Sequence, residues 1–435
     1  MRIVVLGAGV VGATSAWYLA RAGHAVTVID RQGAAALETS FANGGQVSAS
    51  HAEPWANPAA PRKILRWLGR EDAPLLFRAR ADWAQWRWAL AFLFECLPAR
   101  ARANTRELLS LALYSRGQLQ ALRRELGIEY DQARRGILTF HTDRRDFDRA
   151  ARQAEVLREL GAEREVKSPD QCVAIEPALA HARAGLVGGV FAPNDESGDA
   201  FKFTQAIAEH GARIGVRFRY GCSVERLEME RGRVASVIVH DAHEGAEEPV
   251  TADAYVVALG SYSPLLLRPV GIAIPMQPVK GYSITLPLEA GDEAPQVSLT
   301  DEAAKIVFSR LGDRLRVAGT AELAGYDTEV NAVRCEALVR RTFALFPRAG
   351  RAERAEHWSG LRPATPSNRP LIGRTRVPNL YLNTGHGTLG WTLACGSARA
   401  LADLLSGCRP EPHFGFLQSS ERAGGAPLET APRSS

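Results

Sequence analysis

A nucleotide-binding unit begins at the second residue of this sequence. Residues 2–7 have the apolar pattern of a buried strand, and Gly7, Gly9 and Gly12 follow it at GxGxxG spacing. A helical pattern comes next, and then a second apolar strand over residues 25–30 that ends in Asp30. Glycines at these positions permit a tight turn, close approach of a pyrophosphate and close helix–strand packing, while the acid accepts hydrogen bonds from a ribose. The pattern predicts a dinucleotide site.

Composition sets outer limits. The chain has 435 residues, 46% hydrophobic and 23% charged, which is typical of a soluble globular protein with two or three domains. Its net charge of +5 comes from arginines spread along the chain, so no clustered nucleic-acid face is expected. Six scattered cysteines without a CxxC pair, and histidines without an HExxH motif, predict neither a disulfide framework nor a metal site. The cysteines are expected to fill the core, and the location to be cytoplasmic.

Apolar periodicity predicts an α/β chain with a discontinuous organisation. Strand patterns at the start, around residues 251–260 and at residues 379–383 belong to one nucleotide-binding sheet. We therefore expect a Rossmann-like nucleotide-binding domain from residues 1–60, 190–265 and 355–417. A second, α+β domain with an antiparallel sheet is expected from residues 61–189 and 266–354. The polar stretch 418–435 is predicted to be a disordered tail.

Three features favour FAD over NAD as the dinucleotide. The motif lies at the N-terminus with no compact catalytic domain directly after it, and a meander of short strands precedes the strand that ends at Gly260. Near the C-terminus, a strand is followed by residues 385–390 (GHGTLG) and a helix, without the second strand and acid that another dinucleotide site would need. The N–H groups of Thr388, Leu389 and Gly390 would instead stabilise the negative charge of a reduced flavin. An NAD-binding dehydrogenase remains the alternative.

The motifs resemble those of the bacterial D-amino acid dehydrogenases, in the wider D-amino acid oxidase/glycine oxidase class of FAD enzymes. The resemblance extends to about residue 417. It rests on VVLGAGVVG at 4–12, AWYL at 16–19, LETS at 37–40, PNDESGD at 193–199, GSYS at 260–263, PVKGYS at 278–283, WSGLRPATP at 358–366 and NTGHGTLGWT at 383–392. Departures occur at Phe41, Gly44 and residues 367–369. The last of these leaves the preferred substrate size open, because that loop is expected to line the pocket.

The resemblance implies roles for four side chains. Arg362, in the GLRP string, would bind the substrate carboxylate through two parallel charge-assisted hydrogen bonds; its alternative is a structural Arg bonded to loop carbonyls. Tyr282 would bond substrate from the strand near the flavin, and Lys305 would lie on the substrate side. His386 would face the flavin. The alternatives are a sheet Tyr, a solvated Lys and a structural turn His.

The expected cofactor-binding residues share short side chains or positions at strand ends. Ser40 to Gln46 form a small, polar loop that suits close approach of the flavin or pyrophosphate. Val224 is assigned to adenine by the resemblance alone. The full set is Gly7, Gly9, Val10, Val11, Gly12, Asp30, Arg31, Ser40, Asn43, Gly44, Gly45, Gln46, Val224, Gly260, Gly387, Thr388, Leu389 and Gly390.

An aromatic cluster lies in a helical segment that also carries Arg80 and Arg87. It has two interpretations: a buried helix of the second domain, or a surface that meets a membrane or a quinone. The second would place the protein peripherally on the inner membrane. The aromatic residues are Trp83, Trp86, Trp88, Phe92 and Phe94.

The resulting functional hypothesis is oxidative deamination of D-amino acids to 2-oxo acids and ammonia. The α-hydrogen would leave as hydride to flavin N5, and the electrons would pass to a quinone or another acceptor. No Asp, Glu or His base is evident in the motifs, and a neutral amine needs none. Two alternatives share the flavin motifs: oxidation of a cyclic or secondary amine such as D-hydroxyproline, and a non-catalytic flavin-binding partner subunit. The residues leave the preferred amino acid and the oligomeric state open.

Overall fold

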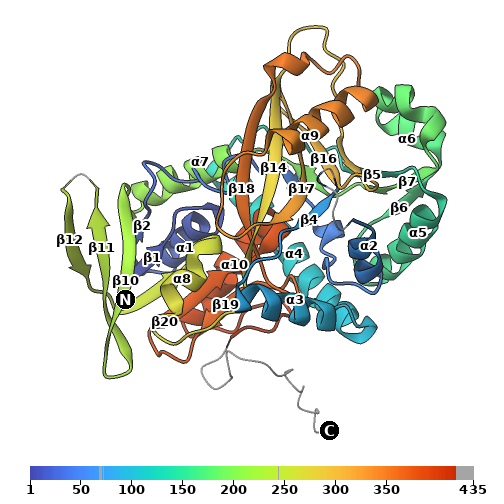
Figure 1. The fold of residues 1–435 in the computed structure, drawn as a ribbon. Coiled ribbons are helices and arrows are strands. Elements are labelled where there is room, and N and C mark those ends of the chain that lie inside the picture. Colours follow the sequence, from blue (N-terminus) through green and yellow to red (C-terminus); the bar gives the residue numbers. More distant parts are fainter. Residues whose placement is uncertain (68–70, 72, 243, 418–435) are drawn as a thin grey trace.

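The computed structural model describes residues 1–67, 71, 73–242 and 244–417. The predicted tail, residues 418–435, lies outside them. A six-stranded sheet takes its strands from the beginning, middle and end of the chain, as the sequence predicts (Figure 1). Its order is β19 (Leu371–Arg374), β20 (Leu380–Thr384), β13 (Ala254–Val257), β1 (Arg2–Leu6), β2 (Ala25–Ile29) and β9 (Arg217–Arg219). All neighbours pair in parallel except β19, which is antiparallel to β20.

Helices cover one face of this sheet and share its core. They are α1 (Val10–Arg21), α4 (Pro98–Leu126), α7 (Ala200–Arg213) and α10 (Gly390–Leu405). The assignment of α4 to the second domain was wrong, because Leu108 and Leu111 of α4 are fully buried in the same apolar cluster as Ile3 and Val5 of β1. Apolar spacing shows that a helix has a buried face, but it does not show which layer that face contacts.

The other face of the six-stranded sheet is covered by a small meander. Its strands are β10 (Cys222–Glu230), β11 (Arg233–Asp241) and β12 (Ala246–Val250), and the short helix α8 (Ser263–Leu267) lies beside them. Apolar residues of the meander, such as Leu227 and Val237, pack against Val4 and Leu6 of β1. The nucleotide-binding sheet is therefore buried on both faces, as its continuous apolar strands require.

A nine-stranded sheet forms the second layer system, mostly antiparallel as predicted. In order it contains β18 (Glu356–Ala364), β14 (Gln277–Pro287), β17 (Arg314–Leu323), β16 (Ile306–Leu311), β15 (Ser298–Asp301), β5 (Ile137–His141), β7 (Gly188–Ala192) and β6 (Glu165–Lys167), with β4 (Leu75–Phe77) beside β17. One detail differs from the prediction. β18 belongs to this sheet although residues 355–417 were assigned to the nucleotide-binding domain.

The remaining helices surround this second sheet. Helix α9 (Ala332–Leu345) packs on one of its faces, where Leu338 joins Ile284 in a second apolar core. Helices α2 (Ala60–Trp67) and α3 (Trp83–Glu95) pack near β4 and β14, whereas α5 (Arg144–Glu159) and α6 (Pro169–Ile175) lie at the other end of the sheet, beside β6 and β7. A two-stranded antiparallel ribbon of β3 (Gln46–Val47) and β8 (Glu196–Ser197) connects the loop that follows β2 with the segment that precedes α7. Among the described residues, no helix combines the length and hydropathy needed to cross a membrane.

Candidate active site

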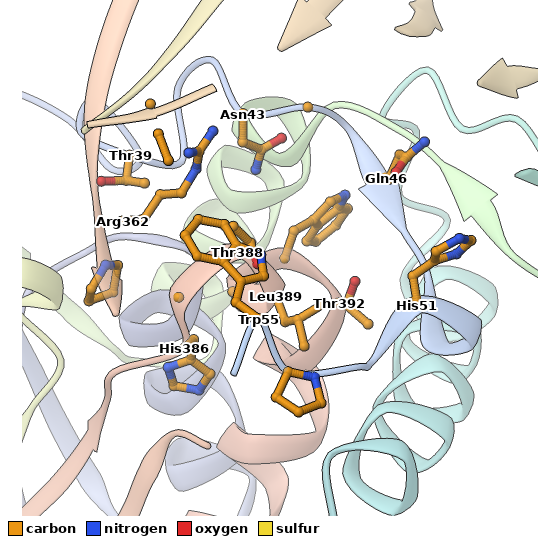
Figure 2. A pocket seen from close by; sticks show the side chains of 18 of the residues that line it. Thr39, Asn43, Gln46, His51, Trp55, Arg362, His386, Thr388, Leu389 and Thr392 are labelled. Carbon is orange, nitrogen blue, oxygen red and sulfur yellow. The ribbon is translucent and has the colours of Figure 1, made fainter. Parts of the chain in front are cut away.

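A cavity of about 1580 Å³ is lined by residues of both sheets. It reaches from the glycine turn after β1, past the start of α10, to β5 and helices α2, α4 and α5. In Figure 2, Arg362 and His51 lie on opposite sides of this cavity, with Thr388 and Leu389 between them. Within the described residues, no group of three or more His, Cys, Asp or Glu side chains could hold a metal ion. Five cysteines are buried, whereas Cys408 is exposed and so does not fill the core as expected.

The glycine turn has the shape that a pyrophosphate needs. Gly7 has a φ of +102°, and a Cβ there would lie 2.6 Å from the Ala258 carbonyl oxygen. A Cβ on Gly12 would lie 1.9 Å from the Gly7 carbonyl oxygen, so helix and turn can approach only with glycine. Over Gly9, in contrast, the nearest atom to such a Cβ is the Ser40 Oγ at 3.5 Å, and the space opens into the cavity. These residues fit a dinucleotide phosphate at the start of α1.

The ribose and adenine end is built around Asp30. Its carboxylate accepts the Ala8 N–H at 2.6 Å and the Gln32 N–H at 2.8 Å, and burial raises its pKa above the usual value. Arg31 pairs with Glu38 at 2.6 Å and stacks on Tyr262. Pairing of β10 with β11 shifts register just after Val224, which lines the cavity. Such bulges free backbone groups, which is consistent with the predicted adenine contact.

The loop after the second strand is held by its own polar groups and by the second sheet. Ser40 Oγ accepts the Val10 N–H at 3.1 Å, so the first N–H group of α1 already has a partner. Asn43 Oδ1 accepts the Gly45 N–H at 2.9 Å. A Cβ on Gly44 would lie 2.5 Å from the Val307 side chain, which explains a glycine there. The Gln46 amide turns toward β15, where it donates to Ser298 at 3.0 Å.

The turn before α10 places residues 387–390 on the cavity wall, and Gly260 lies across from them at the end of β13. Gly387 has a φ of +55°. The Leu389 N–H was predicted to be free, but it donates to the His386 carbonyl at 3.0 Å. His386 is buried, its Nε2 lies 3.0 Å from Ser397 Oγ, and burial lowers its pKa to about 3. It is therefore neutral in the folded protein at neutral pH.

Arg362 is a partly buried cation without an acid partner among the described residues. Its Nη1 donates to the Thr320 carbonyl at 2.7 Å, and no acid contributes to its pKa, which burial and the nearby Arg334 lower to about 10. The guanidinium lies over Gly281, where a Cβ would be 2.3 Å from Cζ. It lines the cavity, remains charged at neutral pH, and keeps N–H groups for a ligand carboxylate.

Thr320 is a site residue that sequence reasoning missed. It lies in β17 with a φ of +57°, and the β14–β17 register shifts at this point. Left-handed backbone is rare for a β-branched residue, so the surrounding structure must impose it. The bulge aims the Thr320 carbonyl at Arg362, while the Thr320 Oγ1 lies buried on the cavity wall without a partner among the described residues. No sequence signal marks such a position.

Two predicted site residues are placed differently from the expectation. The Tyr282 hydroxyl donates to Glu322 at 2.5 Å, and its ring joins the apolar core beside α9, although Tyr282 also contributes to the cavity wall. Lys305 lies on the cavity wall but pairs with Glu302, and its side chain is 40% exposed. The structure therefore brings Arg362 and His386 to one part of the cavity and leaves the Tyr282 hydroxyl outside it.

The loop 367–369 was expected to line the pocket, and it does not. It acts one step behind the wall, because Asn368 Oδ1 accepts the Trp55 N–H at 2.8 Å and Trp55 lines the cavity. Arg369 pairs with Glu107 of α4 at 2.6 Å. This loop therefore supports the segment that carries Trp55.

A buried hydrogen-bond chain on the far side of the cavity was also missed. Thr139 Oγ1 lies 2.7 Å from His51 Nε2, and His51 Nδ1 lies 2.9 Å from Ser48 Oγ. Ser48 donates to Asp195 at 2.6 Å, so its oxygen accepts from His51 Nδ1–H, and Thr139 donates to Nε2. Burial, with Arg164 and Lys305 nearby, holds the pKa of His51 well below its usual value. The members come from distant stretches of sequence, so no local motif announces them.

A family model described as FAD dependent oxidoreductase matches residues 2–404. The chain belongs to this family. The FAD expected from the glycine turn and the α10 turn is thus the family's cofactor, and the NAD alternative is set aside.

Curated relatives agree over nearly the whole length. The chain is 61% identical over 418 residues to a D-amino acid dehydrogenase of Dechloromonas aromatica, covering 96% of this chain and 100% of that protein. It is 53% identical over 408 residues to one of Paramagnetospirillum magneticum, covering 94% and 95%. Among solved structures, glycine oxidase from Geobacillus kaustophilus has a TM-score of 0.73 at 22% identity, covering 95% of this chain and 96% of that one. That likeness confirms the predicted fold class.

Proposed function

We propose that this protein is an FAD-dependent D-amino acid dehydrogenase, which oxidises D-amino acids to 2-oxo acids and ammonia. The observation that carries the proposal is Arg362, a partly buried guanidinium with no acid partner among the described residues, on the wall of a cavity whose other end fits a dinucleotide. The relatives named D-amino acid dehydrogenase, at up to 61% identity over nearly full length, support the D configuration and the amine chemistry.

Arg362 fixes the substrate through its carboxylate. Its Nη1 is held by the Thr320 carbonyl, so the guanidinium plane is oriented before the substrate arrives. The remaining N–H groups form charge-assisted bonds to the two carboxylate oxygens and set the direction of the α-carbon. Gly281, Gly319 and Gly360 line this part of the cavity, and a Cβ on Gly281 or Gly360 would collide with the Arg362 or Trp358 side chain.

FAD supplies the hydride acceptor when it is bound. Around the reacting carbon the chain needs no base if the amine is neutral, and the nearest imidazole in the α10 turn, His386, is held neutral by burial. The turn at residues 387–390 presents a helix N-terminus, whose positive dipole suits negative charge on the reduced cofactor. The positioning of the carboxylate is therefore the main contribution of the protein.

We further propose that the electrons pass to a quinone at a membrane surface. Helix α3 exposes an apolar stripe at helical spacing: Trp83 is 71% exposed, Leu90 63% and Phe94 54%. Trp88 and Phe92 of the same helix are buried, so the helix has one face in the core and one outside. Arg66 and Arg87 are exposed nearby, and aromatic and basic residues together suit an anionic lipid interface.

The decisive experiment is anaerobic mixing of the FAD-containing protein with D- and L-alanine and with D-hydroxyproline, followed at the visible flavin absorbance. Rapid bleaching by D-alanine, with no bleaching by L-alanine, is expected. Bleaching by D-hydroxyproline alone would favour a cyclic-amine enzyme. Bound FAD that none of these compounds bleaches would indicate a non-catalytic flavin-binding subunit, and either result would overturn the proposal.

A further inference from the structure

The cavity has a second lobe that the amino acid substrate does not use. We define the lobe by wall residues from three helices and one strand. They are Lys63, Ile64 and Trp67 of α2, Ala101 of α4, Asp146, Ala150 and Val156 of α5 with Leu160 directly after it, and Thr139 and His141 of β5. The whole cavity of about 1580 Å³ also includes the glycine turn and the Arg362 site.

The distance between the Arg362 site and the lobe can be derived from the pairing of the strands that separate Thr320 from His141. Gly319 of β17 pairs with Ile306 of β16, Ile306 with Asp301 of β15, and Asp301 with Phe140 of β5. Thr320 and His141 are the next residues in this row, three strand spacings apart, which is about 14 Å at ~4.8 Å per spacing. D-alanine spans only a few bonds of about 1.5 Å each, so a molecule bound at Arg362 leaves this lobe free.

The polar end of the lobe carries an unsatisfied group. His141 is 3% exposed and lines the cavity, yet neither of its ring nitrogens has a partner among the described residues. Burial lowers its pKa, so the imidazole is neutral and offers one N–H donor and one acceptor. Lys63, Asp146, Glu302 and Lys305 surround it, and the two lysines are paired with these acids. The ring is therefore the free hydrogen-bonding group of this cluster.

The rest of the lobe combines apolar and charged walls and leads to the exposed face of α3. Ile64, Trp67, Val156 and Leu160 form its apolar part, and Val156 and Leu160 are 46% and 38% exposed. The exposed residues Arg62, Arg102, Arg106 and Arg149 line the cavity from α2, α4 and α5. Helix α2 links the lobe to α3, because Ile64 lines the lobe and also joins the buried face of α3. A ligand that enters here passes these arginines and the apolar residues before it reaches His141.

We propose that this lobe binds the head group of a quinone, with the His141 ring donating a hydrogen bond to one quinone carbonyl. A quinone combines a flat apolar ring with carbonyl acceptors, which suits the apolar wall residues and the neutral donor of His141. This inference rests on the proposed function. The overall reaction balances, because D-alanine, water and a quinone give pyruvate, ammonium and a quinol, with the α-hydrogen and one ammonium proton ending on the quinol.

The lobe can be tested without turnover. Oxidised, FAD-containing protein is titrated by calorimetry with a ubiquinone that carries one isoprene unit, in the absence of any amino acid. His141→Leu is expected to weaken binding at least tenfold. Ala150→Trp, which fills the lobe from α5, should do the same, and Arg152→Trp is its control on the same helix outside the cavity wall. Unchanged affinity in both His141→Leu and Ala150→Trp overturns the proposal.

Half-reactions then distinguish the two possible occupants. In both variants, flavin reoxidation by the short-chain ubiquinone should slow at least tenfold, while anaerobic bleaching by D-alanine changes less than twofold. If bleaching by D-arginine falls instead and quinone binding persists, the lobe takes long substrate side chains and the quinone site is refuted. If no amino acid bleaches the wild-type flavin, the proposed function fails, and the calorimetric titration still reports whether the lobe binds quinone.

Discussion

Arg362 carries the substrate contact, and its replacement separates charge from shape. Arg362→Ala removes both hydrogen-bonding arms, so kcat/KM for D-alanine should fall at least 10³-fold, equivalent to about 4 kcal/mol. Arg362→Lys keeps the charge but loses the planar fork, and an intermediate loss is expected. Steady-state kinetics with an artificial electron acceptor measure both. FAD content should be unchanged, because Arg362 lies on the nine-stranded sheet; an Ala variant with wild-type kcat/KM contradicts the assignment.

Thr320 has a strained backbone and holds Arg362 through its carbonyl oxygen. Thr320→Val keeps the β-branched shape and removes the buried hydroxyl, which we expect to contact the substrate. KM for D-alanine should rise about tenfold, near the value of one hydrogen bond to a charged group. Thr320→Ser should remain close to wild type. Binding of a non-reacting carboxylate, followed by the flavin spectrum, provides a second readout; equal affinity in the Val and Ser variants would remove the hydroxyl from the site.

Tyr282 should matter for stability rather than for turnover. Its hydroxyl donates to Glu322, which is 2% exposed and also pairs with Arg78. Tyr282→Phe should therefore lower the free energy of unfolding by about 1–3 kcal/mol, because a buried carboxylate loses a donor. Urea unfolding measures this loss, and kcat/KM for D-alanine should stay within twofold. A hundredfold loss of activity in a stable variant would return Tyr282 to the catalytic site.

The turn and the helix start that the sequence predicts belong to a local motif. Gly7, Gly9 and Gly12 are close together in the chain, and their spacing alone encodes a turn and a helix start. The failures depend on register. Whether Tyr282 faces the cavity follows from the alternation along β14 and the bulge opposite it at Thr320, and neither can be read from composition or spacing.

At the scale of elements, the exposed face of α3 makes a direct prediction about membranes. Leu90→Gln and Phe94→Gln together remove two exposed apolar side chains. Because each full burial is worth about 1.5–3 kcal/mol, the pair should reduce binding to phosphatidylglycerol vesicles more than tenfold. Met229→Gln, an exposed position on β10, is the control. Co-sedimentation measures binding; equal binding by both variants, or a dimer that forms through this face, would contradict a lipid contact.

The sequence predicts the helices and strands themselves, but it does not predict which layers they pack against. Helix α7 begins directly after Asp199, whose side chain accepts the N–H groups of Phe201 and Lys202 as residues of this type do at helix starts. Helix α4 and strand β18 were assigned to the wrong layers, since a buried face is compatible with any apolar partner. The position of β18 explains the site. This strand pairs with β14 of the nine-stranded sheet, and the pairing brings Arg362 next to Gly281.

For the whole molecule, the buried histidines are expected to lower the free energy of unfolding at acid pH. Burial lowers the pKa of His386 to about 3 and lowers those of His51 and His141, while in the unfolded chain each has its ordinary pKa near 6.5. Below pH 6.5 the unfolded state therefore binds more protons, so stability falls as pH falls. For His386 alone the loss between pH 6.5 and 5.0 is about 2 kcal/mol, and it continues toward pH 3.

The contribution of His386 can be isolated by comparing two proteins. Urea unfolding at pH 7.5, 6.5 and 5.0 should show that His386→Gln is less stable than wild type at neutral pH, because its fit to Ser397 is altered. The variant should nevertheless lose about 2 kcal/mol less than wild type on going to pH 5.0, since glutamine does not titrate. Identical pH slopes would mean that His386 is protonated without cost in the folded protein, and that the α10 turn admits positive charge beside the cofactor.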